Sequence, residues 1–118
     1  MQHILVVDDS LTERTRLAGI LKDAGYQVLT ASSGNEAATI AKNQHPDLIF
    51  LDIIMDDGDG YKTCRDLKRD DETKKIPVIM VSSKSNSVDK KWAMKLGASA
   101  YITKPYEAED ILAELEKL

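Results

Sequence analysis

Residues 48–52 read Leu-Ile-Phe-Leu-Asp, four apolar residues followed at once by a carboxylate. Two more apolar runs, residues 4–7 and 78–81, also lack the alternation of polar and apolar side chains that marks a half-exposed strand. Uninterrupted runs of this length are typical of parallel strands that are covered on both faces. The three runs therefore predict the centre of a parallel sheet.

Weaker signals flank these runs. Residues 26–30, after Gly25, and residues 100–102, after Gly97, are expected to form edge strands. Between the strands, apolar residues recur at the spacing of amphipathic helices. Ser10 stands three residues before Glu13, and Ser33 three before Glu36, as in a capping box, which predicts the starts of two of these helices. The five groups are Leu17, Ile20, Leu21 and Ala24; Ala37, Ile40 and Ala41; Tyr61, Cys64 and Leu67; Val88, Trp92 and Leu96; and Ile111, Leu112, Leu115 and Leu118. This fivefold alternation predicts a three-layer α/β fold in a single domain, residues 1–118.

The overall composition limits the kinds of partner and the cellular compartment that we expect. The 118 residues carry a formal charge of −4, which gives no reason to expect a nucleic acid or an anionic membrane as partner. No apolar run approaches the ~20 residues needed to span a bilayer, and no secretory signal is visible. A single cysteine excludes an internal disulfide and fits the cytoplasm.

Reactive side chains follow four of the five expected strands. Asp8 and Asp9 follow the first, Asp52 the third, Ser82 the fourth and Lys104 the fifth. In a parallel sheet these strand ends meet at one edge, where ligands bind. Clustered carboxylates favour a hard cation such as Mg²⁺, and a carboxylate can accept a phosphoryl group whose oxygens a lysine and a hydroxyl stabilise. Such residues also follow strands simply because they cap the next helix. The hypothesis of phosphoryl transfer therefore depends on all of these side chains meeting at one site.

Four segments resemble the signature regions of CheY-like response regulator receiver domains: ILVVDDS (4–10), LDIIM (51–55), VIMVSS (78–83) and GASAYITKPY (97–106). Their order and spacing match along the whole chain. The resemblance implies a flavodoxin-like (βα)5 fold with strand order 2-1-3-4-5.

The resemblance also implies a role for each matching residue. Asp8, Asp9, Asp52 and the backbone carbonyl of Ile54 correspond to the Mg²⁺ ligands, and Asp52 to the phosphorylated aspartate. Ser82 corresponds to the switch hydroxyl, Lys104 to the lysine that pairs with phosphate, Pro105 to the proline after a cis peptide bond and Tyr101 to the aromatic switch residue. Two departures are Asp56, where the family usually has proline, and Ser83, where it has a smaller residue. Loss of the proline predicts a more mobile loop.

The implied function is a switch that accepts a phosphoryl group from a histidine kinase and signals by contact with another protein. The output surface is expected on the fourth helix, fifth strand and fifth helix of a monomer or weak dimer. Because the chain ends soon after the fifth helix, no DNA-binding output domain is expected. The stretch VDKKWAMKLGA (88–98) resembles single-domain regulators of type IV pilus chemotaxis, which suggests motility control.

Two alternatives remain open from the sequence. One is a phosphohydrolase with an aspartate nucleophile, although Ile54 stands where such enzymes have a second aspartate. The other is an unphosphorylated adaptor, which would not need the set of Asp9, Asp52, Ser82 and Lys104. The chain catalyses only its own phosphorylation and dephosphorylation under the receiver hypothesis, so it is not expected to be an enzyme in the usual sense.

Other motifs have simpler interpretations. The DDGDG loop lacks the spacing of a calcium-binding EF-hand, His3 and His45 are expected to be structural or solvated, and Cys64 is expected in the core. Lys84, Lys90, Lys91 and Lys95 form a basic cluster around the fourth helix, for which a solvated face is simpler than a site for an acidic partner. Trp92 fits either the core or a partner surface.

Overall fold

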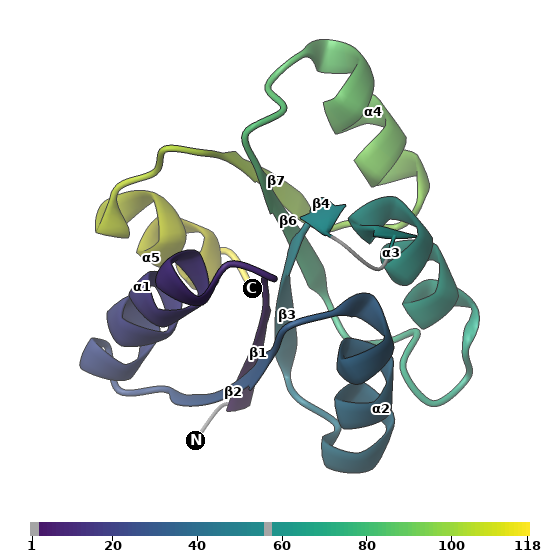
Figure 1. Cartoon of the computed structure of the whole chain (residues 1–118), viewed down its shortest axis with the longest axis horizontal. Helices are drawn as coiled ribbons and strands as arrows, with labels where there is room; N and C mark the ends of the chain where they lie inside the picture. The colour runs from purple at the N-terminus through teal and green to yellow at the C-terminus, as the bar shows by residue number, and fades with distance from the viewer. Residues whose placement is uncertain (1–2, 56–57) are drawn as a thin grey trace.

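The computed structural model describes residues 3–55 and 58–118 (Figure 1). In this part of the chain, five parallel strands form one sheet in the order β2-β1-β3-β6-β7. The strands are β1 (His3–Val7), β2 (Gln27–Ala31), β3 (Leu48–Asp52), β6 (Val78–Ser82) and β7 (Ala100–Thr103). The three uninterrupted apolar runs lie in the centre and the two weaker candidates at the edges, as predicted. Strands β4 and β5 lie outside this sheet. When only the five strands of the sheet are numbered in chain order, their order is the expected 2-1-3-4-5.

Five helices within residues 3–55 and 58–118 cover the sheet, as predicted. Helices α1 (Leu11–Asp23) and α5 (Ala108–Glu116) lie on one face, and α2 (Gly34–Gln44), α3 (Gly60–Arg69) and α4 (Ser87–Lys95) lie on the other (Figure 1). Each face has its own apolar core. Phe50 and Ile79 point into the first core, and Leu51 and Met80 into the second, because successive residues of a strand point to opposite faces. None of the helices in the described residues is both long and apolar enough to cross a membrane.

The helix ends follow from local hydrogen bonding. Ser10 and Ser33 cap α1 and α2 by accepting from the backbone N–H groups of Glu13 and Glu36, as the sequence predicts. Asn86 caps α4 in the same way, and α5 begins with a reciprocal capping box between Glu107 and Asp110. The chain leaves α1 and α4 through Gly25 and Gly97, whose φ angles of 97° and 104° favour glycine.

A short antiparallel hairpin, β4 (Ile54–Met55) and β5 (Gly58–Asp59), follows β3 and was not predicted. It ends at Gly60, where α3 begins. A Cβ atom at Gly60 would collide with the backbone carbonyl of Asp52, so this turn requires glycine. The predicted effect of Asp56 on this loop falls on residues 56 and 57, outside the described residues.

Candidate functional site

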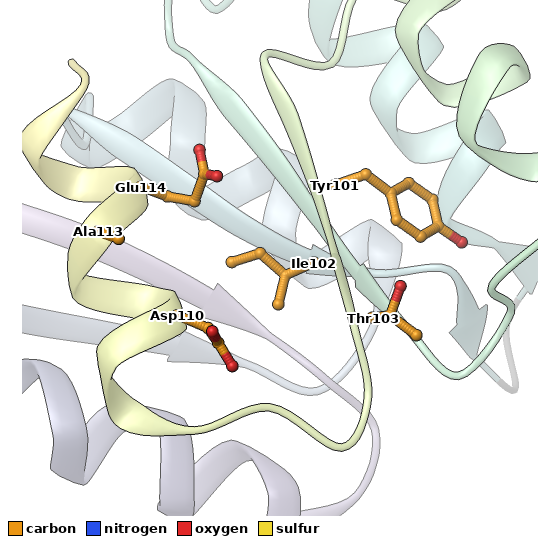
Figure 2. Close-up of a pocket in the computed structure, with 6 residues that line it drawn as sticks. All are labelled: Tyr101, Ile102, Thr103, Asp110, Ala113 and Glu114. Atoms are coloured by element: carbon orange, nitrogen blue, oxygen red, sulfur yellow. The ribbon is translucent and has the colours of Figure 1, made fainter. Parts of the chain in front are cut away.

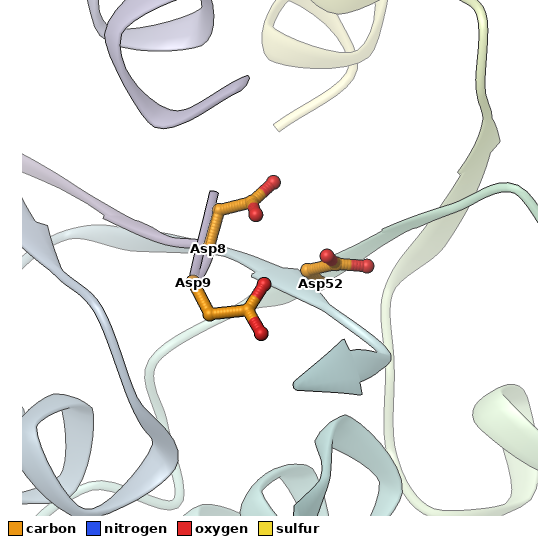
Figure 3. A group of neighbouring side chains, drawn as sticks. All are labelled: Asp8, Asp9 and Asp52. Atoms are coloured by element: carbon orange, nitrogen blue, oxygen red, sulfur yellow. The ribbon is translucent and has the colours of Figure 1, made fainter. Parts of the chain in front are cut away.

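Three carboxylates meet at the carboxyl edge of the sheet (Figure 3). Asp8 and Asp9 follow β1, and Asp52 is the last residue of β3. The pairing of Val7 with Leu51 in neighbouring strands brings the next residue of each strand to the same level. As a result, one carboxylate oxygen from each residue lies within 4.8 Å of the others. Asp8 and Asp52 are buried, whereas Asp9 is partly exposed.

Asp8 is held firmly by its surroundings. Its backbone N–H donates to the carbonyl of Ala31 at 3.1 Å, and its Oδ1 accepts from the N–H of Ser10 at 2.9 Å. Arg14 donates from Nη1 to the backbone carbonyl of Asp8 at 2.8 Å. Arg14 was not singled out from the sequence, because an arginine one turn into a helix carries no signal of its target. These contacts fix the turn that presents both acids.

Lys104 brings an ammonium group to two of these carboxylates. Its Nζ lies 3.0 Å from Oδ2 of Asp8 and 3.6 Å from Oδ2 of Asp52. Its backbone N–H donates to the carbonyl of Ser82 at 2.8 Å, which anchors the end of β7 to the end of β6. The Lys104–Pro105 peptide bond is cis, as the resemblance implies.

Burial has the largest effect on the pKa of Asp52. Burial raises the pKa of Asp52 to about 6, with a smaller raising effect from Asp8 and an opposing, lowering effect from Lys104. Burial also tends to lower the pKa of Lys104, but the hydrogen bond to Asp8 and the charges of Asp52 and Asp8 raise it overall. The lysine therefore stays protonated, and Asp52 is mostly ionised at neutral pH.

The donor set fits a divalent cation. Three carboxylates lie together beside Lys104, and burial, with smaller contributions from Asp8 and Asp9, raises the pKa of Asp52. Oxygen atoms are the ligands that Mg²⁺ prefers. Ile54, the fourth predicted ligand, begins β4, and its N–H donates to Oδ1 of Asp52 at 3.3 Å. Its carbonyl oxygen remains a predicted ligand.

The two predicted switch residues meet at Lys84. Ser82 is fully buried at the end of β6, and its Oγ accepts from the N–H of Lys84 at 3.2 Å. The Tyr101 hydroxyl donates to the carbonyl of the same residue at 2.6 Å. Burial raises the pKa of Tyr101, so the phenol stays neutral and able to donate. Ser83, the second departure from the family pattern, is exposed.

A groove of about 320 Å³ lies beside Tyr101, between β7 and α5 (Figure 2). Its walls are Tyr101, Ile102 and Thr103 from the strand and Asp110, Ala113 and Glu114 from the helix. The two acids give it a negative wall on the face where the output surface is expected.

Comparison with known proteins agrees with this geometry. Residues 4–116 match the family model described as the response regulator receiver domain. Protein PilH of Pseudomonas aeruginosa is 41% identical over 112 residues, which are 95% of this chain and 93% of PilH. Protein PilG of the same organism is 39% identical over 96% of this chain and 84% of its own length.

The solved structure of chemotaxis response regulator CheY4 of Vibrio cholerae superposes with a TM-score of 0.93 at 30% identity, covering 99% of this chain and 98% of CheY4. A probable transcriptional regulator, ycf27 of Cyanophora paradoxa, is 37% identical over 99% of this chain. The chain spans only 48% of that longer relative. Together these matches extend along nearly all of the chain.

Proposed function

The chain belongs to the response regulator receiver domain family, and from this premise we propose that it is a phosphorylation-activated switch of a two-component system. The observation that carries the proposal is a buried, ionisable Asp52 with Lys104 at 3.6 Å and two further acids beside it. The donor would be a histidine kinase, and the output would be contact with a partner protein.

In the proposed reaction, a carboxylate oxygen of Asp52 attacks the phosphorus of a phosphohistidine. The new O–P bond forms as the P–N bond breaks, and the imidazole leaves with the bonding electron pair. The product is an acyl phosphate on Asp52, which water later hydrolyses. A pKa of about 6 keeps the carboxylate ionised, and so nucleophilic, at neutral pH.

Neighbouring residues stabilise the transferred group. Asp8, Asp9, Asp52 and the carbonyl of Ile54 would hold Mg²⁺, which when bound offsets the negative charge of the acids and the phosphoryl oxygens. Lys104 already lies against Asp52, so its ammonium can pair with a phosphoryl oxygen after a small movement.

The Lys84 peptide links the pocket to the output surface. A phosphoryl group on Asp52 would attract the Ser82 hydroxyl, which now accepts from the Lys84 N–H. The same movement would release the Tyr101 hydroxyl from the Lys84 carbonyl and let the ring turn inward. The surface of α4, β7 and α5 would then change shape, and the population would shift toward the active form.

The likeness to PilH and PilG supports control of motility as the setting. We place the protein in the cytoplasm as one receiver domain, residues 1–118, that acts as a monomer or weak dimer. Receiver domains act in signalling. The chemistry proposed for this chain is accordingly limited to its own phosphorylation and dephosphorylation.

Intact mass spectrometry after incubation with acetyl phosphate and Mg²⁺ tests the proposal. One phosphoryl group should be added to the parent protein and none to Asp52→Asn, whose side chain is nearly isosteric. Asp23→Asn is a matched control, because Asp23 is exposed at the end of α1. Full phosphorylation of Asp52→Asn, with circular dichroism showing an intact fold, would refute the assignment of the acceptor.

A further inference from the structure

Helices α3 and α4 enclose a second groove, of about 330 Å³, that belongs neither to the carboxylate pocket nor to the groove between β7 and α5. Tyr61, Lys62 and Arg65 line it from α3, and Trp92 and Leu96 from α4. We refer to these five residues as the α3–α4 groove. None of them has a role in the proposed phosphoryl transfer.

One part of the groove is apolar. Trp92 and Leu96 are one helical turn apart, so both point to the same side of α4. Trp92 is 49% exposed, although it could have packed in the core. Tryptophan is enriched where proteins bind one another, because it combines a large apolar surface with a polar N–H group. The exposed indole therefore favours a partner surface over a purely structural role.

The other part of the groove is cationic and has an unmet hydrogen-bonding requirement. Nε of Arg65 is shielded from solvent and has no hydrogen-bond acceptor among the residues that the structure describes. The nearest carboxylate oxygen, Oδ1 of Asp66, is 3.9 Å away, and the other oxygen of Asp66 accepts from Lys62 at 2.7 Å. A shielded donor without an acceptor costs free energy. The Arg65 side chain as a whole is 43% exposed, so a ligand carboxylate can form paired hydrogen bonds with its guanidinium group.

Charged residues outside the groove also favour a ligand with carboxylates. Lys91 and Lys95, one turn apart on α4, line a separate hollow of about 490 Å³ with Lys90 and Met94. Lys62 and Arg65 are likewise one turn apart on α3. Cations thus recur along both helices, in a chain whose net charge is −4. Of the acids nearby, Asp66 pairs with Lys62, and Asp89 accepts from the Tyr61 hydroxyl at 2.7 Å.

We propose that the α3–α4 groove binds an acidic, amphipathic peptide segment of a partner protein. Apolar side chains of the segment would pack against Trp92 and Leu96, and its carboxylates would pair with Arg65 and the lysines at one-turn intervals. A segment with several acids fits this repeated spacing better than a small anion does. A nucleic acid fits less well, because the groove joins cations to the apolar side chains of Trp92 and Leu96, and an acidic amphipathic segment can satisfy both. Binding does not require phosphorylation of Asp52.

Trp92 is the only tryptophan in the chain, so its fluorescence reports directly on the groove. The probe is a synthetic helical peptide with leucine on one face and glutamate on the other, titrated into unphosphorylated protein. We expect saturable binding with a blue shift of the Trp92 emission. A peptide in which every glutamate is replaced by lysine should not bind, and doubling the salt concentration should weaken binding.

Arg65→Gln should weaken binding roughly tenfold, because one charge-assisted pair is lost, and Lys62→Gln should also weaken it. Arg69→Gln is the matched control, since Arg69 is exposed on the same helix outside the groove. Equal affinity of the Arg65→Gln and Arg69→Gln proteins would overturn the proposal. Binding without a change in Trp92 emission, or binding of a single-stranded oligonucleotide but not of the acidic peptide, would also overturn it. Because no phosphodonor is present, these outcomes are independent of the acceptor role of Asp52.

Discussion

Helices α4 and α5 both pack beside β7 and both contain nine residues, yet they are held very differently. Ile111 and Leu115 of α5 are buried. In α4, every residue of which the structure describes, Ala93 is the only buried residue. Both helices begin with a cap, so capping does not explain the difference. Val88, Trp92 and Met94 of α4 instead expose large apolar surfaces.

The difference can be expressed as free energy. Burying one isoleucine or leucine side chain stabilises a fold by about 1.5–3 kcal/mol, whereas an alanine contributes much less. The segment that leads into α5 is also tied to α1, because Arg16 donates to the Tyr106 carbonyl at 3.0 Å and lies 4.6 Å above the Tyr106 ring. Helix α4 depends more on polar contacts, such as the bond between Tyr61 and Asp89. Moving α4 while α5 stays in place should therefore cost less free energy than moving α5.

The largest expected effect is that of Ile111→Ala. It removes a fully buried side chain from the core between α5 and the sheet, and should lower the free energy of unfolding by about 3 kcal/mol. Trp92→Ala on α4 removes a larger side chain but should cost less than about 1 kcal/mol, because half of that side chain is already exposed. Urea denaturation measures both. Similar losses in the two variants would contradict the proposed difference between the helices.

Next in size is Arg16→Met, which keeps the aliphatic stem and removes the guanidinium. The loss of one hydrogen bond and one cation–π contact should cost about 1–2 kcal/mol. Arg69→Met, at an exposed position of α3, is the control and should have little effect. If Arg16→Met were as stable as the control, the tie between α1 and α5 would not anchor α5.

A smaller and more local effect is expected from Tyr61→Phe. Removing the hydroxyl leaves Asp89 without its donor and should make local opening of α4 easier by about 1 kcal/mol, roughly fivefold. Cys64 reports this opening, because its buried thiol lies 3.9 Å from the carbonyl of Leu96 at the end of α4. Alkylation of Cys64 should be about fivefold faster in Tyr61→Phe. Tyr26→Phe, on the opposite face of the sheet, should leave the rate unchanged.

The pH dependence of alkylation checks that opening is involved. Burial raises the pKa of the Cys64 thiol to about 11 from an ordinary value of 9.0. Between pH 9 and 11, the thiol is therefore neutral in the closed form but ionised in the opened form. Rising pH in this range thus favours opening. If reaction requires opening, the rate should keep rising with pH from 9 toward 11, and Tyr61→Phe should stay about fivefold faster throughout. Equal rates of the two proteins over this range would indicate direct reaction in the closed form, and a rate that levels off near 9 would contradict the burial of Cys64.

The sequence predicted the fold well because its signals are local. Apolar runs identified the buried strands, and Ser10 and Ser33 identified two helix starts. The site residues were predicted as a group, since strand ends must meet. The hairpin of Ile54–Met55 with Gly58–Asp59 was not, because two-residue strands have no detectable periodicity. The pairing of Tyr61 with Asp89 was also missed, since it joins residues 28 apart whose positions depend on how α3 and α4 pack.

The smallest expected effect, that of Val88→Ala, tests whether anything covers α4 in solution. Val88 is 74% exposed, so truncation removes little buried surface, and alanine is the better helix former. The free energy of unfolding should therefore change by less than about 0.5 kcal/mol, at low and high protein concentration alike. Val78→Ala makes the same chemical change at a fully buried position of β6 and should cost about 2 kcal/mol. A loss at Val88 that grows with protein concentration would mean that a second copy covers α4. The contrast between α4 and α5 would then hold only for the monomer, because association would supply the burial that α4 lacks within its own chain.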